Sequence, residues 1–195
     1  SQINPHFLFN SLTVIGSICR TEPLKARELI GSLSEHFRKT INTSSDMVSI
    51  EEEIGHVKSY VSIEKARLSE DLEVIYNVDE LSQFSIPPLT LQPMIENAIK
   101  HGIYPKKGKG IIHFTIYKES GAHVIRVSDD GVGMKPDIVD KIMMGHLAKE
   151  DSYGTNNVIE RMKSAFEDRF SYDISSKPNE GTEVVFRIME EGQYA

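Results

Sequence analysis

Hydrophobic residues over the first 70 positions recur at steps of three and four, which is the spacing of one buried face of an amphipathic helix. The pattern predicts three helices, over residues 2–19, 24–41 and 49–68. Pro23 separates the first two, because proline lacks a backbone N–H and crowds the preceding turn. Ser49 with Glu52 three residues later is a capping-box signal that opens the third helix. Cys19 lies on the apolar side of the first helix, so we expect it in the core.

From residue 72 onward, apolar and polar residues alternate, which is the period of a half-buried strand. Strands are predicted over residues 72–78, 112–116, 125–127 and 184–188. Helical spacing returns between them and predicts helices over residues 89–101, 136–144 and 158–170. This order favours an α/β sandwich with helices on one face of a sheet. The whole chain is therefore expected to be of the α+β class, with helices first and the sandwich after them.

The first long helices cannot bury their apolar faces well by themselves. Pairing with a second copy of the chain into a four-helix bundle is one solution. Packing of the same helices onto the second half of the chain is the alternative.

The composition restricts the function classes. The 195 residues carry a formal net charge of −7, whereas a nucleic-acid-binding surface needs a basic face, so no nucleic-acid partner is expected. The single cysteine cannot form an internal disulfide, which fits a reducing compartment. No apolar run approaches the ~20 residues that cross a bilayer. The chain starts without a methionine inside a patterned segment, so we expect a soluble piece of a longer protein.

Three polar residues, Gln2, His6 and Asn10, are four apart and would form one stripe beside the apolar face of the first helix. A neutral imidazole is a competent nucleophile, and an unperturbed histidine is roughly three-quarters neutral at pH 7. The alternative is an ordinary polar stripe near a helix start. The other histidines show no metal-ligand spacing and are interpreted as surface or strand residues: His36, His56, His101, His113, His123 and His146.

Two later segments carry groups suited to a nucleotide. In Glu-Asn-Ala-Ile-Lys-His-Gly (residues 96–102), the amide oxygen of Asn97 suits Mg²⁺, and Lys100 supplies a cation for phosphate one turn on. In Asp-Asp-Gly-Val-Gly (residues 129–133), Asp129 ends a predicted strand and could accept a hydrogen bond from an exocyclic amine. Taken alone, Asn97 and Lys100 are a pair of surface residues on a helix, and residues 129–133 are a plain turn.

Two glycine-containing segments complete the series. Gly154 precedes an amphipathic helix, whose first free N–H groups and positive dipole end would face a phosphate. Gly181 and Thr182 stand just before a predicted strand and by themselves indicate a turn.

The order of these segments is more specific than any one of them, and it resembles the Bergerat-type ATP-binding fold of the GHKL superfamily. Residues 2–10 (Gln-Ile-Asn-Pro-His-Phe-Leu-Phe-Asn) and 91–102 (Leu-Gln-Pro-Met-Ile-Glu-Asn-Ala-Ile-Lys-His-Gly) are similar to the LytS/YesM class of sensor histidine kinases. The resemblance covers nearly the whole chain. It implies a helical dimerisation and histidine phosphotransfer domain over residues 1–70 and an ATP-binding catalytic domain over residues 71–195.

The resemblance also implies a role for each matching residue. His6 accepts the γ-phosphoryl group, and Asn10 orients a water or a partner unless it is only a structural cap. Asn97 is the Mg²⁺ ligand and Lys100 a phosphate contact. The other nucleotide contacts are His101, Asp129, Gly131, Gly133, Gly154, Thr155, Gly181 and Thr182. Residues 134–153 would form the ATP lid, and residues 69–72 a hinge between the domains.

The sequence departs from related patterns in three places. Ser152 and Thr155 replace a glycine and a leucine that usually end the lid, which makes tight ATP binding less secure. Phe7 follows the histidine where many histidine kinases of other classes place an acidic general base, so Glu96 is considered for that role, with a structural ion pair as its alternative. Pro93 stands where ATP-hydrolysing superfamily members have a glutamate, which favours transfer to a side chain over hydrolysis.

These features predict a two-component kinase core that uses ATP and Mg²⁺ and passes phosphate from His6 to an aspartate of a response-regulator receiver domain. We expect a homodimer formed through the first helices. Membrane contact would occur only through segments absent from this chain, as in the cytoplasmic portion of a bacterial membrane protein. A pseudokinase that binds nucleotide poorly and acts as a dimerisation and docking module is the alternative. A second alternative is a GHKL ATPase or serine kinase, but the Pro-His-Phe-Leu-Phe-Asn segment at residues 5–10 disfavours it.

Overall fold

The computed structural model describes residues 5–41, 45–68, 71–79, 83–144 and 155–191. Three helices come first: α1 (Pro5–Ile18), α2 (Pro23–Ile41) and α3 (Ile50–Leu68). Pro23 opens α2, because a first-turn residue needs no N–H for the helix. The predicted capping box is confirmed: the Glu52 N–H donates to Ser49 Oγ at 3.2 Å, and the Ser49 N–H donates to Glu52 Oε2 at 3.2 Å.

A five-stranded mixed sheet forms the second half, in the order β2-β4-β5-β7-β6. The strands are β2 (Leu72–Val78), β4 (Gly110–Glu119), β5 (Ala122–Asp129), β6 (Phe170–Lys177) and β7 (Gly181–Met189). Only the β2–β4 pair is parallel, and the other pairs are antiparallel. A two-residue turn joins β4 to β5, and its residues Ser120 and Gly121 have φ of 49° and 76°, the sign that matches the twist of a hairpin.

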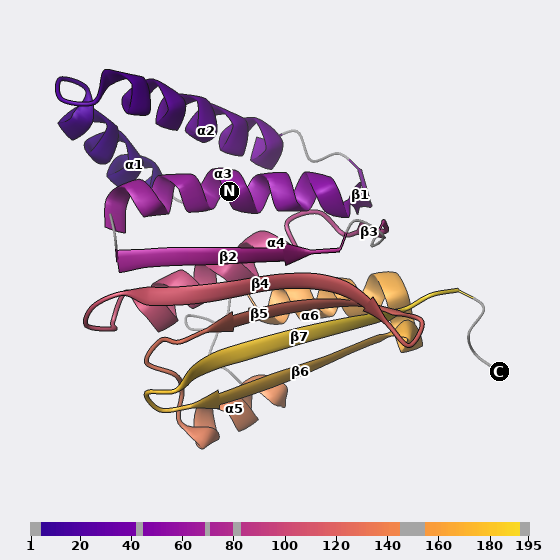
Figure 1. Ribbon diagram of the computed structural model, residues 1–195. Coiled ribbons are helices and arrows are strands. Elements are labelled where there is room, and N and C mark those ends of the chain that lie inside the picture. The colour runs from indigo at the N-terminus through magenta and orange to yellow at the C-terminus, as the bar shows by residue number, and fades with distance from the viewer. Residues whose placement is uncertain (1–4, 42–44, 69–70, 80–82, 145–154, 192–195) are drawn as a thin grey trace.

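Shorter elements complete the fold. They are β1 (Val48–Ser49), which pairs with β3 (Ser85–Ile86), α4 (Leu91–Asn97), the π-helix η2 (Ala98–Ile103), α5 (Pro136–Met143), α6 (Thr155–Phe166) and the 3-10 helix η3 (Glu167–Arg169). The α1–α2 hairpin lies over α3, which runs along β2, while α4 and α6 lie behind the sheet (Figure 1). The fully buried side chains Ile95, Phe114, Met162 and Phe186 come from the second half.

Helix α3 is attached to the segment before α4 by a buried carboxylate. Glu53 is fully buried, and its oxygens accept the backbone N–H groups of Leu89, Thr90 and Leu91 at 2.7, 2.8 and 2.8 Å. From the opposite side, Arg161 of α6 donates to the carbonyl of Leu89 at 2.6 Å. The segment that starts α4 is therefore fixed between α3 and α6. The domain boundary at residue 70 stays a prediction, and residues 69–70 of the predicted hinge lie outside the described residues.

Four sequence expectations were wrong in detail. Cys19 is exposed, because α1 ends at Ile18 and the chain then turns. His36 and His56 are buried on helices rather than exposed. The helix predicted to reach residue 170 ends at Phe166, since Glu167 takes a φ of 51°, outside the helical range. The helix predicted over residues 89–101 is α-helical only to Asn97 and continues as a π-helix.

Candidate functional site

His6 is exposed because its neighbour Phe7 is buried. The Phe7 ring stacks on Tyr60 of α3 at a centroid distance of 5.1 Å and packs beside His36 of α2 at 5.0 Å. Ser11, also buried, donates its hydroxyl to the Phe7 carbonyl at 2.6 Å, which fixes this turn of α1. Phe7 therefore anchors α1, and His6, about 100° around the helix from it, is exposed.

Polar groups from three elements surround the His6 ring. The amide nitrogen of Asn10 lies 3.3 Å from each ring nitrogen, as their spacing of four residues predicts. Burial raises the pKa of Glu64 on α3, the Glu96 charge adds to that rise, and the charges of Arg67 and Lys100 oppose it; His6 also interacts electrostatically with this carboxyl group. Tyr104 donates its hydroxyl to the same carboxylate. The exposed imidazole of His6 therefore interacts electrostatically with the buried carboxyl group of Glu64, which also interacts with Lys100 of η2.

Asn97 is the last residue of α4 and stands where the helix widens into a π-helix. Such π segments occur often at functional sites, since they change the direction of the side chains that follow. The Asn97 amide donates to Thr155 Oγ1 at 2.7 Å, which joins α4 to the first residue of α6. Lys100 pairs with Glu96 at 3.3 Å, so the ion pair that was considered as an alternative for Glu96 is present. His101 is exposed on η2.

Asp129 ends β5 as a buried carboxylate. Its Oδ1 accepts the Gly131 N–H at 2.9 Å, and the backbone of Thr182 on β7 also hydrogen-bonds to it. Burial raises the pKa of Asp129 to about 6, against the lowering effect of these two hydrogen bonds. Two backbone N–H groups therefore hold this carboxylate in position at the end of β5.

The glycines around Asp129 allow close backbone contacts. A Cβ on Gly181, whose φ is 94°, would collide with the Asp129 carbonyl oxygen. One on Gly133, whose φ is 62°, would collide with the carbonyl of Lys177. A Cβ on Gly131 would collide with the backbone of Gly102. The residues predicted from the Asp-x-Gly-x-Gly and Gly-Thr segments are therefore brought together in one place.

Sequence reasoning missed two residues of this cluster. Ser176 accepts the N–H of Met134 at 2.8 Å, donates to the Gly181 carbonyl at 2.8 Å and lies 3.0 Å from Thr182 Oγ1. The alternation of Phe170, Tyr172 and Ile174 could have revealed its strand, β6, but no motif marks the serine itself. Gly102 was quoted within a motif and given no role.

A cavity of about 430 Å³ opens beside this cluster. Its lining includes Asp129, Thr182 and Ser176, with Val139 of α5 on the other side. Asn97 is not among the lining residues. Gly154 and Ser152, and most of the predicted lid, lie outside the described residues.

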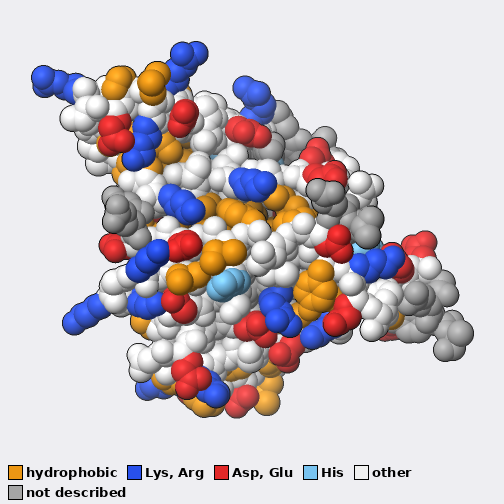
Figure 2. Space-filling model, in the orientation of Figure 1, with side chains coloured by type: hydrophobic (Ala, Val, Ile, Leu, Met, Phe, Trp, Pro, Cys, Tyr) orange, Lys and Arg blue, Asp and Glu red, His pale blue; other side chains and the backbone are white. Residues whose placement is uncertain are grey.

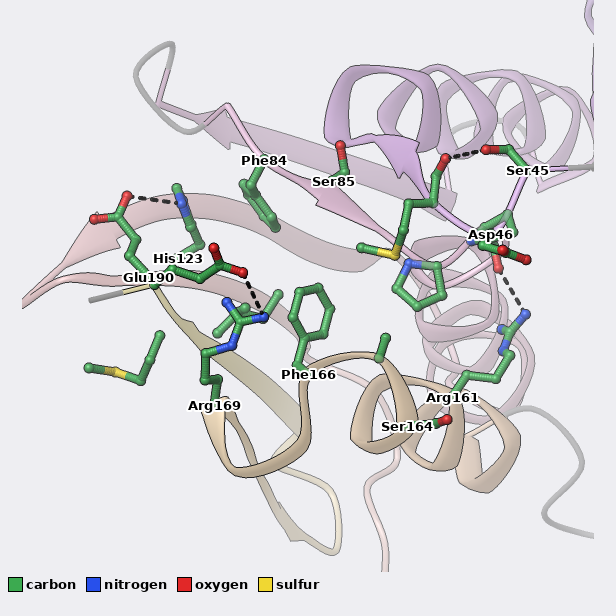
Figure 3. A pocket seen from close by; sticks show the side chains of 17 residues that line it. Ser45, Asp46, Phe84, Ser85, His123, Arg161, Ser164, Phe166, Arg169 and Glu190 are labelled. Atoms are coloured by element: carbon green, nitrogen blue, oxygen red, sulfur yellow. Dashed lines mark hydrogen bonds and ion pairs between the residues drawn. The ribbon is translucent and has the colours of Figure 1, made fainter. Parts of the chain in front are cut away.

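A larger cavity, of about 980 Å³, lies at the other end of the sheet, beside His123 near the start of β5 (Figure 3). Its floor is apolar and includes Phe84 and Phe166. Several of its charged groups are paired: His123 with Glu190 at 3.3 Å, Arg169 with Glu191 at 3.3 Å, and Arg161 with backbone carbonyls. None of the predicted site residues lines it.

Comparisons with known proteins agree with this geometry. The family model "Histidine kinase" matches residues 1–72, and the model "Histidine kinase-, DNA gyrase B-, and HSP90-like ATPase" matches residues 89–192. The second match implies ATP as the ligand of the sheet half. Among the described residues, no helix has the length and apolarity to span a membrane.

Relatives match over nearly the whole chain. Sensor histidine kinase YpdA of Escherichia coli (strain K12) is 37% identical over 189 residues, which cover 96% of this chain and 33% of the relative. Sensor protein LytS of Bacillus subtilis (strain 168) is 31% identical over 201 residues, which cover 99% and 34%. This chain thus spans about a third of the length of these curated relatives.

The fold is also found among solved structures. The histidine kinase domain of the blue-light activated histidine kinase from Erythrobacter litoralis EL346 matches with a TM-score of 0.53 at 14% identity, over 89% of this chain and 80% of that one. This likeness confirms the α+β class, with N-terminal helices followed by a mixed five-stranded sheet. On the family matches and the relatives together, the chain belongs to the sensor histidine kinases, of which it forms the catalytic core.

Proposed function

We propose that this chain transfers the γ-phosphoryl group of ATP to His6 and that the phosphohistidine then passes it to an aspartate of a response-regulator receiver domain. The observation that carries the proposal is the exposed imidazole of His6. It lies on α1, which the buried Phe7 ring anchors on Tyr60 of α3. Both the family matches and the relatives support it.

The nucleotide would be recognised by the cluster around Asp129. An oxygen of that carboxylate accepts the adenine amino group, and Gly131, Gly133, Gly181 and Thr182 surround the base closely. The remaining contacts, all toward the phosphates, are assigned to Lys100, His101, Gly154 and Thr155. The cavity whose lining includes Asp129, Gly181 and Thr182 supports this assignment, while Gly131 and Gly133 are assigned from the resemblance.

The residues at Asn97 fit a magnesium ion. Because the amide nitrogen of Asn97 is used by Thr155, its oxygen is the atom left for a hard cation. Bound Mg²⁺ would supply charge neutralisation between the phosphates of ATP. Lys100 adds a positive charge one turn along η2, although its pairing with Glu96 must loosen for it to reach a phosphate.

In the transfer step, a neutral ring nitrogen of His6 forms a bond to the γ-phosphorus while the bond from that phosphorus to the ADP oxygen breaks. The proton of the attacking imidazole then leaves to a base, for which we propose Glu96. Asn10, 3.3 Å from the ring, holds the imidazole or a water for the reverse reaction. We propose that the helical domain (1–70) and the ATP-binding domain (71–195), with a lid over residues 134–153, come together for the transfer. A hinge at residues 69–72 alone does not account for this movement, because Glu53 fixes α3 to the start of α4.

A homodimer through the first helices is also proposed. Four large apolar side chains of α1 and α2 are exposed: Phe9, Leu12, Leu24 and Ile30. Figure 2 shows hydrophobic surface on the hairpin at the top of the view. Such a patch is typical of an interaction surface. Because the chain spans about a third of its relatives, we further propose that it is the cytoplasmic portion of a bacterial membrane-bound sensor.

Incubation with ATP radiolabelled at the γ-phosphate, in the presence of Mg²⁺, tests the function. Label that is acid-labile and base-stable is expected on the wild-type chain and absent from His6→Gln. His113→Gln, which changes another exposed histidine outside the site, is the matched control and should retain the label. ATP binding without any label would refute the proposal and favour its alternatives.

A further inference from the structure

The hydrogen bond between Asn97 and Thr155 joins two helices that are each fixed by the core. Ile95 and Ile99, on either side of Asn97, are fully buried, and Val158 and Ile159 of α6 are 1% and 3% exposed. The amide nitrogen of Asn97 and the hydroxyl oxygen of Thr155 therefore meet at 2.7 Å between two rigid supports. A contact of this kind limits how the amide can turn.

An asparagine amide can turn by half a rotation about its last side-chain bond at little cost, which exchanges its oxygen and its nitrogen. Only one of these two orientations offers an oxygen to a cation, and the other offers an N–H group that repels it. With the nitrogen bound to Thr155, the oxygen of Asn97 is left free for another partner. The orientation present here is thus the one that a metal-binding asparagine needs.

We propose that Thr155 is a positioning residue that holds the Asn97 amide in place at the metal site, with its oxygen available to the cation. This rests on the proposed binding of Mg²⁺ and ATP and gives a role to a residue that departs from the usual leucine. On this inference Thr155 acts through the Asn97 amide nitrogen that it touches, in place of the direct phosphate contact assigned to it above, so its effect on nucleotide binding should require the metal. A leucine at this position would have no group to accept the amide N–H.

Titration with a fluorescent trinitrophenyl analogue of ATP, in Mg²⁺ and separately in EDTA, tests this role. Thr155→Val removes the hydroxyl at nearly constant volume and should weaken binding in Mg²⁺ by about 3- to 10-fold, the loss expected for one neutral hydrogen bond. In EDTA there is no Mg²⁺ for the Asn97 oxygen to bind, so the nucleotide affinity of Thr155→Val should stay within about twofold of wild type. Thr155→Ser keeps the hydroxyl and should restore the Mg²⁺ value. Thr13→Val on α1 is the matched control and should change neither.

A double-mutant cycle separates positioning from packing. In Asn97→Ala, which has no amide to orient, adding Thr155→Val should cause no further loss in Mg²⁺. Equal weakening of Thr155→Val in Mg²⁺ and in EDTA, or tighter binding in Mg²⁺, would overturn the positioning role. If the wild-type chain binds no nucleotide in either condition, the proposed function itself fails and this inference falls with it. Wild-type binding with an unaffected valine variant refutes the positioning role alone.

Discussion

The carboxylate of Asp129 packs against Gly102, so closely that a Cβ on the glycine would stand 2.5 Å from Oδ1. The Gly102 carbonyl also accepts the Val132 N–H at 3.1 Å. The π-helix η2 and the loop after β5 are thus held together by a contact that only a residue without a side chain permits. This contact links the helix of Asn97 to the carboxylate assigned to adenine.

Replacing Gly102 with alanine should therefore displace Asp129. We expect ATP binding to weaken by about tenfold, with a loss of about 1–3 kcal/mol in the free energy of unfolding from overpacking. Nucleotide titration and urea denaturation measure the two effects. Gly31→Ala is the matched control, because a Cβ at that glycine inside α2 meets no atom within 4 Å: ATP binding should stay unchanged, and the free energy of unfolding should rise by up to about 1 kcal/mol. Unaltered ATP binding in Gly102→Ala would contradict the assigned role of the contact.

Asp129→Asn should separate stability from function. The pKa of Asp129 is raised from 3.8 to about 6, so the folded chain holds the extra proton between these values. The contribution of this group to the free energy of unfolding is therefore full below pH ~4 and is lost as the pH rises through ~6. At pH 7 the ionised buried group costs up to about 3 kcal/mol, and the asparagine variant should be more stable by up to that amount.

The same substitution should reduce ATP binding at pH 7 by at least about tenfold, because the variant presents an N–H where adenine needs an acceptor. Wild-type affinity should itself fall as the pH drops below about 6 and the carboxylate takes up a proton. Urea denaturation at pH 7 and pH 4.5, with ATP titrations across the same range, measures both. A variant less stable than wild type at pH 7 would show that burial is not the dominant effect on Asp129.

Most elements could be predicted from periodicity, because one face of each is buried against one core. The pattern placed β2 at its observed bounds, and α3 was fixed by its capping box. The strand β6 was missed because the preceding helix pattern runs into Phe170, and the break comes from the backbone of Glu167 rather than from a glycine or proline. The π-helix was missed because its one extra residue per turn leaves no mark in the sequence.

The site could be predicted only as far as motifs reach. Asp129, Gly131, Gly133, Gly181 and Thr182 lie together as the motif order implied, and Asn97 meets Thr155. Residues that act through long-range contacts carry no local signal. Glu53 stands one position after the capping-box glutamate, and nothing in the sequence indicated that it would be buried. Its hydrogen-bond partners are 36–38 residues further along the chain.

Phe7→Ala should detach α1 without changing the nucleotide site. Removing the ring leaves a void between Tyr60 and His36, so α1 loses its anchor and His6 its fixed position. Phosphorylation of His6 should slow by about tenfold or more, while the ATP dissociation constant stays within about twofold of wild type. Single-turnover labelling and nucleotide titration give the two values.

Phe9→Ala, which removes a ring that is 67% exposed, is the matched control for stability of the monomer. Equal labelling rates in Phe7→Ala and wild type would refute the anchoring role.

Glu53 should be needed for stability and, through α4, for the position of Asn97. Its carboxylate accepts three backbone N–H groups at the start of that helix, two of them on Oε2 and one on Oε1. Glu53→Gln keeps one acceptor oxygen but turns an N–H toward a donor, and we expect a loss of ~1–2 kcal/mol in the free energy of unfolding. Glu53→Ala leaves all three N–H groups buried without this acceptor and should cost ~3–5 kcal/mol.

Glu52→Ala, which removes only the exposed capping contact, should cost ~1 kcal/mol and is the control. Urea denaturation orders the three variants. If Glu53→Gln still folds but binds ATP more weakly in Mg²⁺ than in EDTA relative to wild type, the clamp also positions Asn97. A glutamine variant as stable as wild type would show that these hydrogen bonds do not hold α3 to α4.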